Sequence, residues 1–208
     1  MTDYCRPLHL EDALALLADG PRMVLAGGTD LYPAAGAGLG TPVLDISGLA
    51  GMREIEAGEG LRIGGGVTWS EIAAAKLPDA FAGLQQAAVQ IGGRQIQNVG
   101  TVAGNICNAS PAADGVPPLL TLDAQVELAS ASGRRRVPLA DFVLGPRRTA
   151  RATDELVLAL HVPAPAVAGK GVFLKLGARA HLVISIVSVA VRCVTIGGIV
   201  TEITVAVG

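Results

Sequence analysis

The stretch VLAGGTDLYP, residues 24–33, passes from an apolar run into two glycines, a threonine and an aspartate. This order is typical of a strand that turns into a short helix. Gly27 and Gly28 lack the Cβ atoms that keep a ligand away from the main chain, and a helix start leaves amide groups without partners. We therefore expect an anion-binding turn, suited to a diphosphate. The alternative is an ordinary turn in which Thr29 caps the helix.

The composition is that of a globular protein without a nucleic-acid partner. Half of the 208 residues are apolar and only 3% are aromatic, so the core should consist of Ala, Val, Leu and Ile. A formal charge of -2 offers no basic field for nucleic acid or an anionic membrane. No signal peptide is recognisable, and Arg192 interrupts the most apolar stretch, which argues against a membrane span.

Cysteines and histidines are scattered along the chain. Three cysteines without a CxxC pair suggest reduced thiols in the cytoplasm, and neither a disulfide framework nor a zinc or iron-sulfur site. The histidines lie in three distant segments and are interpreted as ordinary surface or core residues. These residues are Cys5, Cys107, Cys193, His9, His161 and His181.

Helical and strand patterns alternate in the first part of the chain. Helical spacing in 9–20 is followed by strand-like 22–26, a short helix from Thr29 and strand-like 42–46. These elements predict a unit that ends near residue 55.

A second block should extend from 56 to 166. It begins with a strand and a glycine turn, then a helix from Trp69 or Ser70 and another over 77–93. Glycines, asparagines and prolines interrupt the helical period over 94–120, so we expect a long loop there, and such loops often carry function. A hairpin around Ser132-Gly133 and a strand over 155–163 complete the block.

The remaining residues, 167–208, predict the start of a further sheet. The last apolar strand would leave an edge without a partner, so either another chain covers it or the sequence is a fragment.

A second glycine segment, NVGTVAGN at 98–105, is followed by ASPAAD at 109–114. Neutral N–H and O–H donors suit phosphates and ribose hydroxyls, whereas the carboxylate of Asp114 suits hydroxyl or ring N–H donors. No Walker motif is present and no GxGxxG follows a strand, which argues against P-loop and Rossmann sites. Two separate small-residue segments suggest a long ligand held between two subdomains.

Four stretches resemble the FAD-binding subunit of the molybdenum hydroxylases, the medium chain of the carbon monoxide dehydrogenase and xanthine dehydrogenase type. They are LAGGTDL at 25–31, IGGRQIQNVGTVAGNICNASPAAD at 91–114, PPLLTLDAQVEL at 117–128 and KLGAR at 175–179. The resemblance implies an α+β, two-subdomain FAD-binding fold of the vanillyl-alcohol-oxidase (PCMH) type plus an incomplete C-terminal α/β domain. The expected boundaries are 1–55, 56–166 and 167–208.

The resemblance also implies which residues contact FAD. The first glycine motif would hold the diphosphate, the second segment would continue that cradle, Asp114 would accept from the flavin side, and Lys175 would approach the isoalloxazine. The full expected set is Leu25, Ala26, Gly27, Gly28, Thr29, Asp30, Leu31, Ile91, Gly92, Thr101, Ala103, Gly104, Asn105, Ser110, Asp114, Val157 and Lys175.

Members of this family work in complexes, and the resemblance implies the same here. The chain would be an oxidoreductase subunit without catalytic or metal-binding residues of its own, in a cytoplasmic hetero-oligomer. Electrons would come from a small iron-sulfur subunit and a large molybdopterin subunit and leave through FAD to a terminal acceptor. A cofactor-poor assembly subunit and a self-sufficient flavin oxidoreductase remain alternatives.

The chain departs from the family pattern at two places. Gln97 stands where many relatives have arginine, which removes one possible cationic contact. The stretch KLGARAHLVIS, 175–185, lacks the second arginine and the acid of the usual motif. This second departure concerns contacts of the stretch with the flavin edge or a neighbouring subunit.

Overall fold

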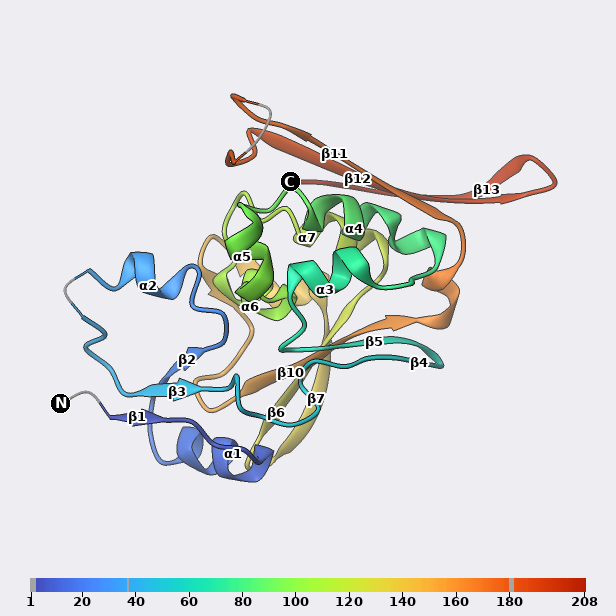
Figure 1. Ribbon diagram of the computed structural model, residues 1–208. Coiled ribbons are helices and arrows are strands. Elements are labelled where there is room, and N and C mark those ends of the chain that lie inside the picture. Colours follow the sequence, from blue (N-terminus) through green and yellow to red (C-terminus); the bar gives the residue numbers. More distant parts are fainter. Residues whose placement is uncertain (1–2, 37, 180–181) are drawn as a thin grey trace.

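The computed structural model describes residues 3–36, 38–179 and 182–208, in which short helices and loops separate three main sheets (Figure 1). Ala180 and His181 lie outside the described residues, so the expectations for His181 and for part of the KLGARAHLVIS stretch are not addressed.

The first sheet is small and parallel. β1 (Tyr4–Cys5) and β2 (Met23–Leu25) both pair with β3 (Val43–Asp45). α1 (Leu10–Ala18) packs its apolar side toward the larger sheet, whereas α2 (Leu31–Ala34) is a single turn. The helix and two strands predicted here are confirmed, while β1 had no detectable pattern because it is only two residues long.

The largest sheet is antiparallel throughout, in the order β4-β5-β10-β6-β7. The predicted hairpin is β6 and β7, and the predicted strand over 155–163 is β10, which has a bulge between Val157 and Ala159. The strands are β4 (Ile55–Gly58), β5 (Gly60–Gly64), β6 (Gln125–Ser130), β7 (Gly133–Pro138) and β10 (Leu156–Pro163).

A group of short helices lies beside this sheet, drawn in green in Figure 1. Ile63, Leu128 and Leu160 of the sheet and Ile72 and Leu84 of the helices are fully or almost fully buried in one hydrophobic core. The helices are α3 (Trp69–Ala74), the 3-10 turn η1 (Asp79–Phe81), α4 (Ala82–Ala88), α5 (Arg94–Val99), α6 (Val102–Asn108) and α7 (Val116–Thr121).

The loop predicted over 94–120 is wrong, because α5, α6 and α7 occupy most of it. Its glycines and prolines lie where helices tolerate them: Gly93 and Gly100 are the cap residues of α5, and Pro117 is in the first turn of α7. First-turn amides have no intrahelical partner, so proline costs little there.

Short elements connect β7 to β10 and β10 to the third sheet. After β7, α8 (Leu139–Phe142) leads into the small hairpin of β8 (Val143–Gly145) and β9 (Arg148–Thr149). The predicted connection at 163–171 contains a 3-10 turn, η2 (Ala164–Val167).

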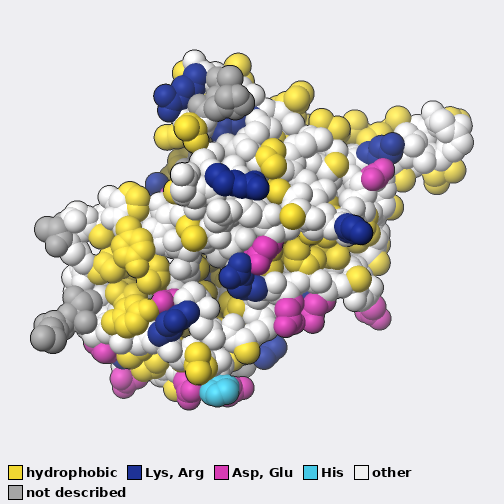
Figure 2. Space-filling model, in the orientation of Figure 1, with side chains coloured by type: hydrophobic (Ala, Val, Ile, Leu, Met, Phe, Trp, Pro, Cys, Tyr) yellow, Lys and Arg dark blue, Asp and Glu magenta, His cyan; other side chains and the backbone are white. Residues whose placement is uncertain are grey.

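The third sheet is antiparallel, with β12 (Val187–Ile196) between β11 (Lys170–Leu176) and β13 (Ile199–Val207). Its inner face packs on α4 through Phe173 and Ala190. The two strands predicted around Gly197-Gly198 are confirmed as β12 and β13. Hydrophobic side chains remain exposed along the arm that these strands form (Figure 2).

Each sheet falls within one of the three expected units, 1–55, 56–166 and 167–208, apart from the first residue of β4. We propose this division as the domain organisation, which the separate sheets support. In the described part of the chain, no helix combines the length and hydropathy needed to cross a bilayer.

Candidate functional site

A cleft of about 860 Å³ opens between the first and second units and reaches the beginning of the third. Its volume falls in the range of roughly 300–1,000 Å³ that is typical of small-molecule sites. The strand ends of the first sheet, the helices α5 and α6, the bulged part of β10 and Lys175 of β11 contribute to its walls.

The expected cofactor residues converge on this cleft. All of them line it except Leu25, which is the buried last residue of β2. Leu25 is followed directly by the loop, so it positions the first glycine loop, residues 26–31, from behind. The residues of the expected set that line the cleft are Ala26, Gly27, Gly28, Thr29, Asp30, Leu31, Ile91, Gly92, Thr101, Ala103, Gly104, Asn105, Ser110, Asp114, Val157 and Lys175.

Gly27 also allows a close main-chain contact that the sequence did not predict. A Cβ atom at Gly27 would overlap the carbonyl oxygen of Val99 and lie 2.9 Å from the amide nitrogen of Gly100. The missing side chain therefore lets the first glycine loop touch the second glycine segment, residues 98–105. Gly28 has φ +69°, a left-handed conformation that favours glycine.

The first glycine loop leaves its amide groups available. Four consecutive N–H groups donate no hydrogen bond to any of the described residues: those of Gly27, Gly28, Thr29 and Asp30. Thr29 does not cap α2, because Asp30 occupies the cap position, and Asp30 makes no capping bond. A single turn has little macrodipole, so the consecutive free amides, and not a helix dipole, make this loop suitable for an oxyanion.

The second glycine segment is partly helical. The Thr101 side chain accepts a hydrogen bond from the Gly104 amide at 2.9 Å and caps α6. Gly104 and Asn105 therefore lie inside α6 and not in a loop. The side-chain oxygen of Asn105 is the only described buried side-chain N or O atom without a hydrogen-bond partner. A buried acceptor of this kind is costly unless a ligand or water donates to it.

Asp114 and Lys175 contact each other. Lys175 Nζ lies 2.6 Å from Asp114 Oδ2, with both side chains over nine-tenths buried, and the Ser185 hydroxyl donates to the other carboxylate oxygen. Lys175 belongs to β11 and Asp114 to the segment before α7, so this pair joins the third sheet to the second unit at the cleft.

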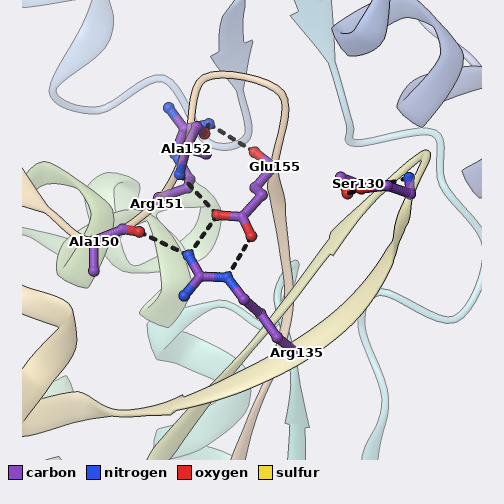
Figure 3. A network of polar contacts seen from close by, with 7 residues as sticks. Ser130, Arg135, Ala150, Arg151, Ala152 and Glu155 are labelled. Carbon is purple, nitrogen blue, oxygen red and sulfur yellow. Dashed lines mark hydrogen bonds and ion pairs between the residues drawn. The ribbon is translucent and has the colours of Figure 1, made fainter.

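Another wall is fixed by Glu155, just before β10 (Figure 3). Arg135 of β7 donates from Nε and Nη2 to the two carboxylate oxygens at 2.6 and 2.8 Å, and the Ala152 amide donates at 2.7 Å. The bond from Arg135 is the main reason why the pKa of Glu155 lies below its ordinary value, although burial opposes it.

Several lining residues were not predicted from the sequence. Gly65 follows β5 in a run of three glycines, the same signal that marked the first loop, whereas the residues near β8 and β9 carry no local signal. Trp69 is a buried core residue that also reaches the cleft. The main unpredicted lining residues are Arg22, Gly65, Cys107, Asn108, Arg147, Thr149, Arg151, Glu155, Val183 and Ile184.

Gln97 does not line the cleft: it is buried and donates to the carbonyl of Val89 at 3.1 Å. Beside the β6–β7 turn, Arg134 and Arg135 are ion-paired to Glu127 and Glu155. Cys107 is free, and burial raises its pKa to about 11.

The donor set fits a flavin dinucleotide. Free amides in the first glycine loop suit a diphosphate, the unpaired Asn105 oxygen suits a sugar or ribityl hydroxyl, and Ile91 and Val157 provide apolar walls for flat rings.

Comparison with known proteins agrees with this chemistry. A family model described as "FAD binding domain in molybdopterin dehydrogenase" matches residues 1–165. A putative xanthine dehydrogenase FAD-binding subunit of Escherichia coli K12 is 35% identical, over 99% of this chain and 73% of the relative. A nicotinate dehydrogenase FAD-subunit of Eubacterium barkeri is also 35% identical, over 89% of this chain and 66% of the relative.

Solved structures show the same fold. A carbon monoxide dehydrogenase from Hydrogenophaga pseudoflava superposes with a TM-score of 0.90 at 28% identity, covering 99% of this chain and 74% of that one. The mixed helix and strand architecture is therefore the expected PCMH-type fold. By the family match, the two relatives and this superposition, the chain belongs to the FAD-binding domains of the molybdopterin dehydrogenases, a family of oxidoreductase subunits whose cofactor is FAD.

Proposed function

We propose that this chain is the electron-transfer flavoprotein subunit of a molybdenum-containing hydroxylase or dehydrogenase, with FAD held in the cleft between the first two units. In this proposal electrons arrive from iron-sulfur clusters on a small partner subunit and leave to a terminal acceptor. A large molybdopterin subunit would oxidise the substrate. When bound, FAD supplies a carrier that can take up electrons singly and release them as a pair.

The observation that carries the proposal is that free amides and an acceptor without a partner lie in the same cleft. The amides of Gly27, Gly28 and Thr29 would hold the diphosphate, and the Asn105 oxygen would accept from a hydroxyl of the sugar or ribityl chain. Because these groups have no partner among the described residues, binding the cofactor would not require them to break a hydrogen bond within the protein.

The other expected residues would orient the rings and keep water out. Ile91 and Val157 are apolar lining residues from separate segments, the turn after α4 and the strand β10. The Lys175–Asp114 pair would close the end of the cleft next to the third sheet, and because both charges are neutralised there, it would present a polar but uncharged surface to the flavin edge.

The expectation of partner subunits rests on the relatives. The relatives from Escherichia coli and Eubacterium barkeri are named as a FAD-binding subunit and a FAD-subunit. A carbon monoxide dehydrogenase relative from Afipia carboxidovorans is named a medium chain. It is 34% identical over 78% of this chain and 59% of the relative. We infer that this chain likewise works in a hetero-oligomer.

The test is to purify the chain after coexpression with the products of neighbouring genes. The proposal predicts an oxidised-flavin spectrum in this chain and its co-purification with an iron-sulfur and a molybdenum subunit. A colourless chain that rejects added FAD would contradict the flavoprotein role and support the assembly subunit. A flavin-loaded chain that turns over substrate without partners would instead indicate a self-sufficient oxidoreductase.

A further inference from the structure

Most charged side chains that line the cleft are neutralised within the protein. The ion pairs that do this are Lys175 Nζ with Asp114 at 2.6 Å, Arg22 Nη1 with Asp3 at 2.7 Å, and Arg135 Nε with Glu155 at 2.6 Å. Among the described lining residues, three charges remain outside such pairs: those of Asp30, Arg147 and Arg151. The cleft therefore carries one more positive than negative uncompensated charge.

Arg147 is held in place at the tip of the β8–β9 hairpin. Its φ of +57° is unusual for a residue other than glycine, and its amide donates to the carbonyl of Ala109 at 2.8 Å. The guanidinium donates to the side-chain and main-chain oxygens of Asn108, at the end of α6. Both acceptors are uncharged, so the positive charge of Arg147 remains available to a ligand.

Arg151 is held in a similar way on the segment that leads to β10. Its Nη1 donates to the carbonyls of Glu155 at 2.6 Å and Ala152 at 3.1 Å (Figure 3). The Glu155 carboxylate is bound on its other side by Arg135. Arg151 is half-buried. Burial raises the pKa of the Cys107 thiol on α6, and the positive charge of Arg151 offsets part of that rise.

Both arginines are thus fixed by neutral main-chain and amide oxygens, on a wall different from the one that carries the first glycine loop. Arg151 is half-buried and is therefore screened less than a cation on an open surface, whereas Arg147 is exposed. Both line a concave wall, which concentrates their field. A flavin dinucleotide has a diphosphate with about two negative charges. The first glycine loop offers neutral amides and no cation, and its Asp30 adds a negative charge.

We propose that Arg147 and Arg151 form the electrostatic anchor of the cleft and hold the negative charge of the bound dinucleotide. This inference rests on the proposed function, because it takes FAD as the occupant. Such an anchor would hold the diphosphate in a cleft whose other described lining cations, Arg22 and Lys175, are ion-paired. Residue 97 lies outside the cleft, and the two glycine segments contain no lysine or arginine.

A purely structural role is the alternative. Arg147 lies at the C-terminal end of α6, where a cation interacts favourably with the helix carbonyls, and Arg151 ties its own loop to Glu155. Such roles would affect folding but would not depend on the charge of the ligand. The experiment therefore compares charged and uncharged ligands.

The test measures dissociation constants of the full chain for FAD, ADP and riboflavin across a range of salt concentrations. ADP carries a diphosphate, whereas riboflavin carries no phosphate. We expect Arg147→Gln and Arg151→Gln each to weaken FAD and ADP binding roughly ten-fold at low salt, the scale of one charge-assisted contact. Their salt dependence should become shallower, and riboflavin binding should stay unchanged. Arg151→Lys, which keeps the charge, should retain most of the affinity.

Arg148→Gln is the matched control. It removes the same charge from the adjacent residue, which is exposed and does not line the cleft. It should leave all three affinities and the salt dependence unchanged. Thermal unfolding of each variant reports separately on folding.

Two outcomes would overturn the inference. One is unchanged FAD and ADP binding in the double variant Arg147→Gln/Arg151→Gln. The other is an equal loss for FAD and riboflavin with an unaltered salt dependence, which would assign both arginines a structural role. If the chain bound ADP in an arginine-dependent way but did not bind FAD, the result would support the role of the two arginines and contradict the flavin function. A wild-type chain that binds neither ADP nor FAD would contradict both.

Discussion

Gly27 and Val99 come from different units of the chain, and their main chains are in direct contact. A Cβ atom at Gly27 would overlap the Val99 carbonyl oxygen and would also lie 2.5 Å from its carbonyl carbon. Backbone atoms cannot move away as a side chain can, so only glycine allows this approach. The contact sets the distance between the first glycine loop and the second glycine segment, and therefore the width of the cleft.

Gly27→Ala should separate the two loops and abolish flavin retention. The added methyl group meets main-chain atoms of Val99 and Gly100, and overpacking of this kind costs about 1–3 kcal/mol in the free energy of unfolding. We expect the purified variant to be colourless, or to release FAD on gel filtration, as measured by flavin absorbance per protein.

Gly20→Ala is the control for this substitution. No atom lies within 4 Å of a Cβ at Gly20, and its φ is not in the left-handed range. This variant should keep the wild-type flavin content. Normal flavin content in Gly27→Ala would mean that the contact between the two glycine segments does not determine the width of the cleft.

The position of the first glycine loop could be predicted from the sequence, but the contact that requires glycine at position 27 could not. A strand followed by Gly-Gly is a local pattern, and it located the turn correctly. That Gly27 meets Val99 depends on how distant segments pack, which no local pattern contains. Only Gly28, with its left-handed backbone, follows from local conformation.

The helices over 94–120 were missed for a related reason. They are short, and their glycines and prolines lie at caps and in first turns, where these residues do not disturb hydrogen bonds. Arg147 and Glu155 were missed as lining residues because neither belongs to a motif. They reach the cleft through a hairpin and the bulged strand β10.

The lowered pKa of Glu155 predicts that the stability of the fold depends on pH in a specific way. Because Arg135 lowers the pKa of Glu155 in the folded chain from its ordinary value of 4.5, the ionised carboxylate stabilises the fold above that value. This contribution should be lost as the pH falls through the folded-state pKa. Arg135→Gln should therefore reduce the free energy of unfolding at pH 7 and have a smaller effect in acid, once the pH lies below the folded-state pKa of Glu155.

Urea unfolding at several pH values measures this difference. Arg136→Gln removes the same charge from the next position of β7 and leaves the bonds between Arg135 and Glu155 in place. It should show no such pH-dependent difference. An Arg135→Gln effect that is constant from neutral to acid pH would contradict the assignment.

The Lys175–Asp114 pair should be strongly coupled in the flavin-free chain. Lys175→Met leaves a buried carboxylate and Asp114→Asn leaves a buried ammonium, and breaking a buried pair on one side costs about 3–5 kcal/mol. The double variant should be less destabilised than the sum of the two, because neither charge then remains unpaired.

A double-mutant cycle by urea unfolding measures the coupling. Lys170 and Asp79 provide the control pair: they lie 3.9 Å apart and their side chains are 80% and 74% exposed. Their coupling energy should be near zero, since exposed pairs contribute little. Equal coupling in the two pairs would contradict the role given to burial at the cleft.

Arg192 should determine how firmly the third sheet is attached to the second unit. Its side chain is 2% exposed, and its Nε donates to the carbonyl of Thr121, at the end of α7, at 2.7 Å. A second nitrogen is bonded to Glu202 on β13. Lysine cannot make these divergent bonds with one ammonium group, so the two cations are not equivalent here.

Arg192→Met and Arg192→Lys should both destabilise the chain, by about 3 kcal/mol for the loss of a charged hydrogen bond and the buried carbonyl left unpaired. Hydrogen exchange should become faster in β11, β12 and β13 before it does so in the five-stranded sheet, because the lost contact joins these two parts. Arg148→Gln, on the exposed hairpin, should change neither quantity. If Arg192→Lys were as stable as the wild type, a positive charge at this position would be sufficient to attach the third sheet. The carbonyl of Thr121 would then not be the group that fixes this sheet beside the cleft.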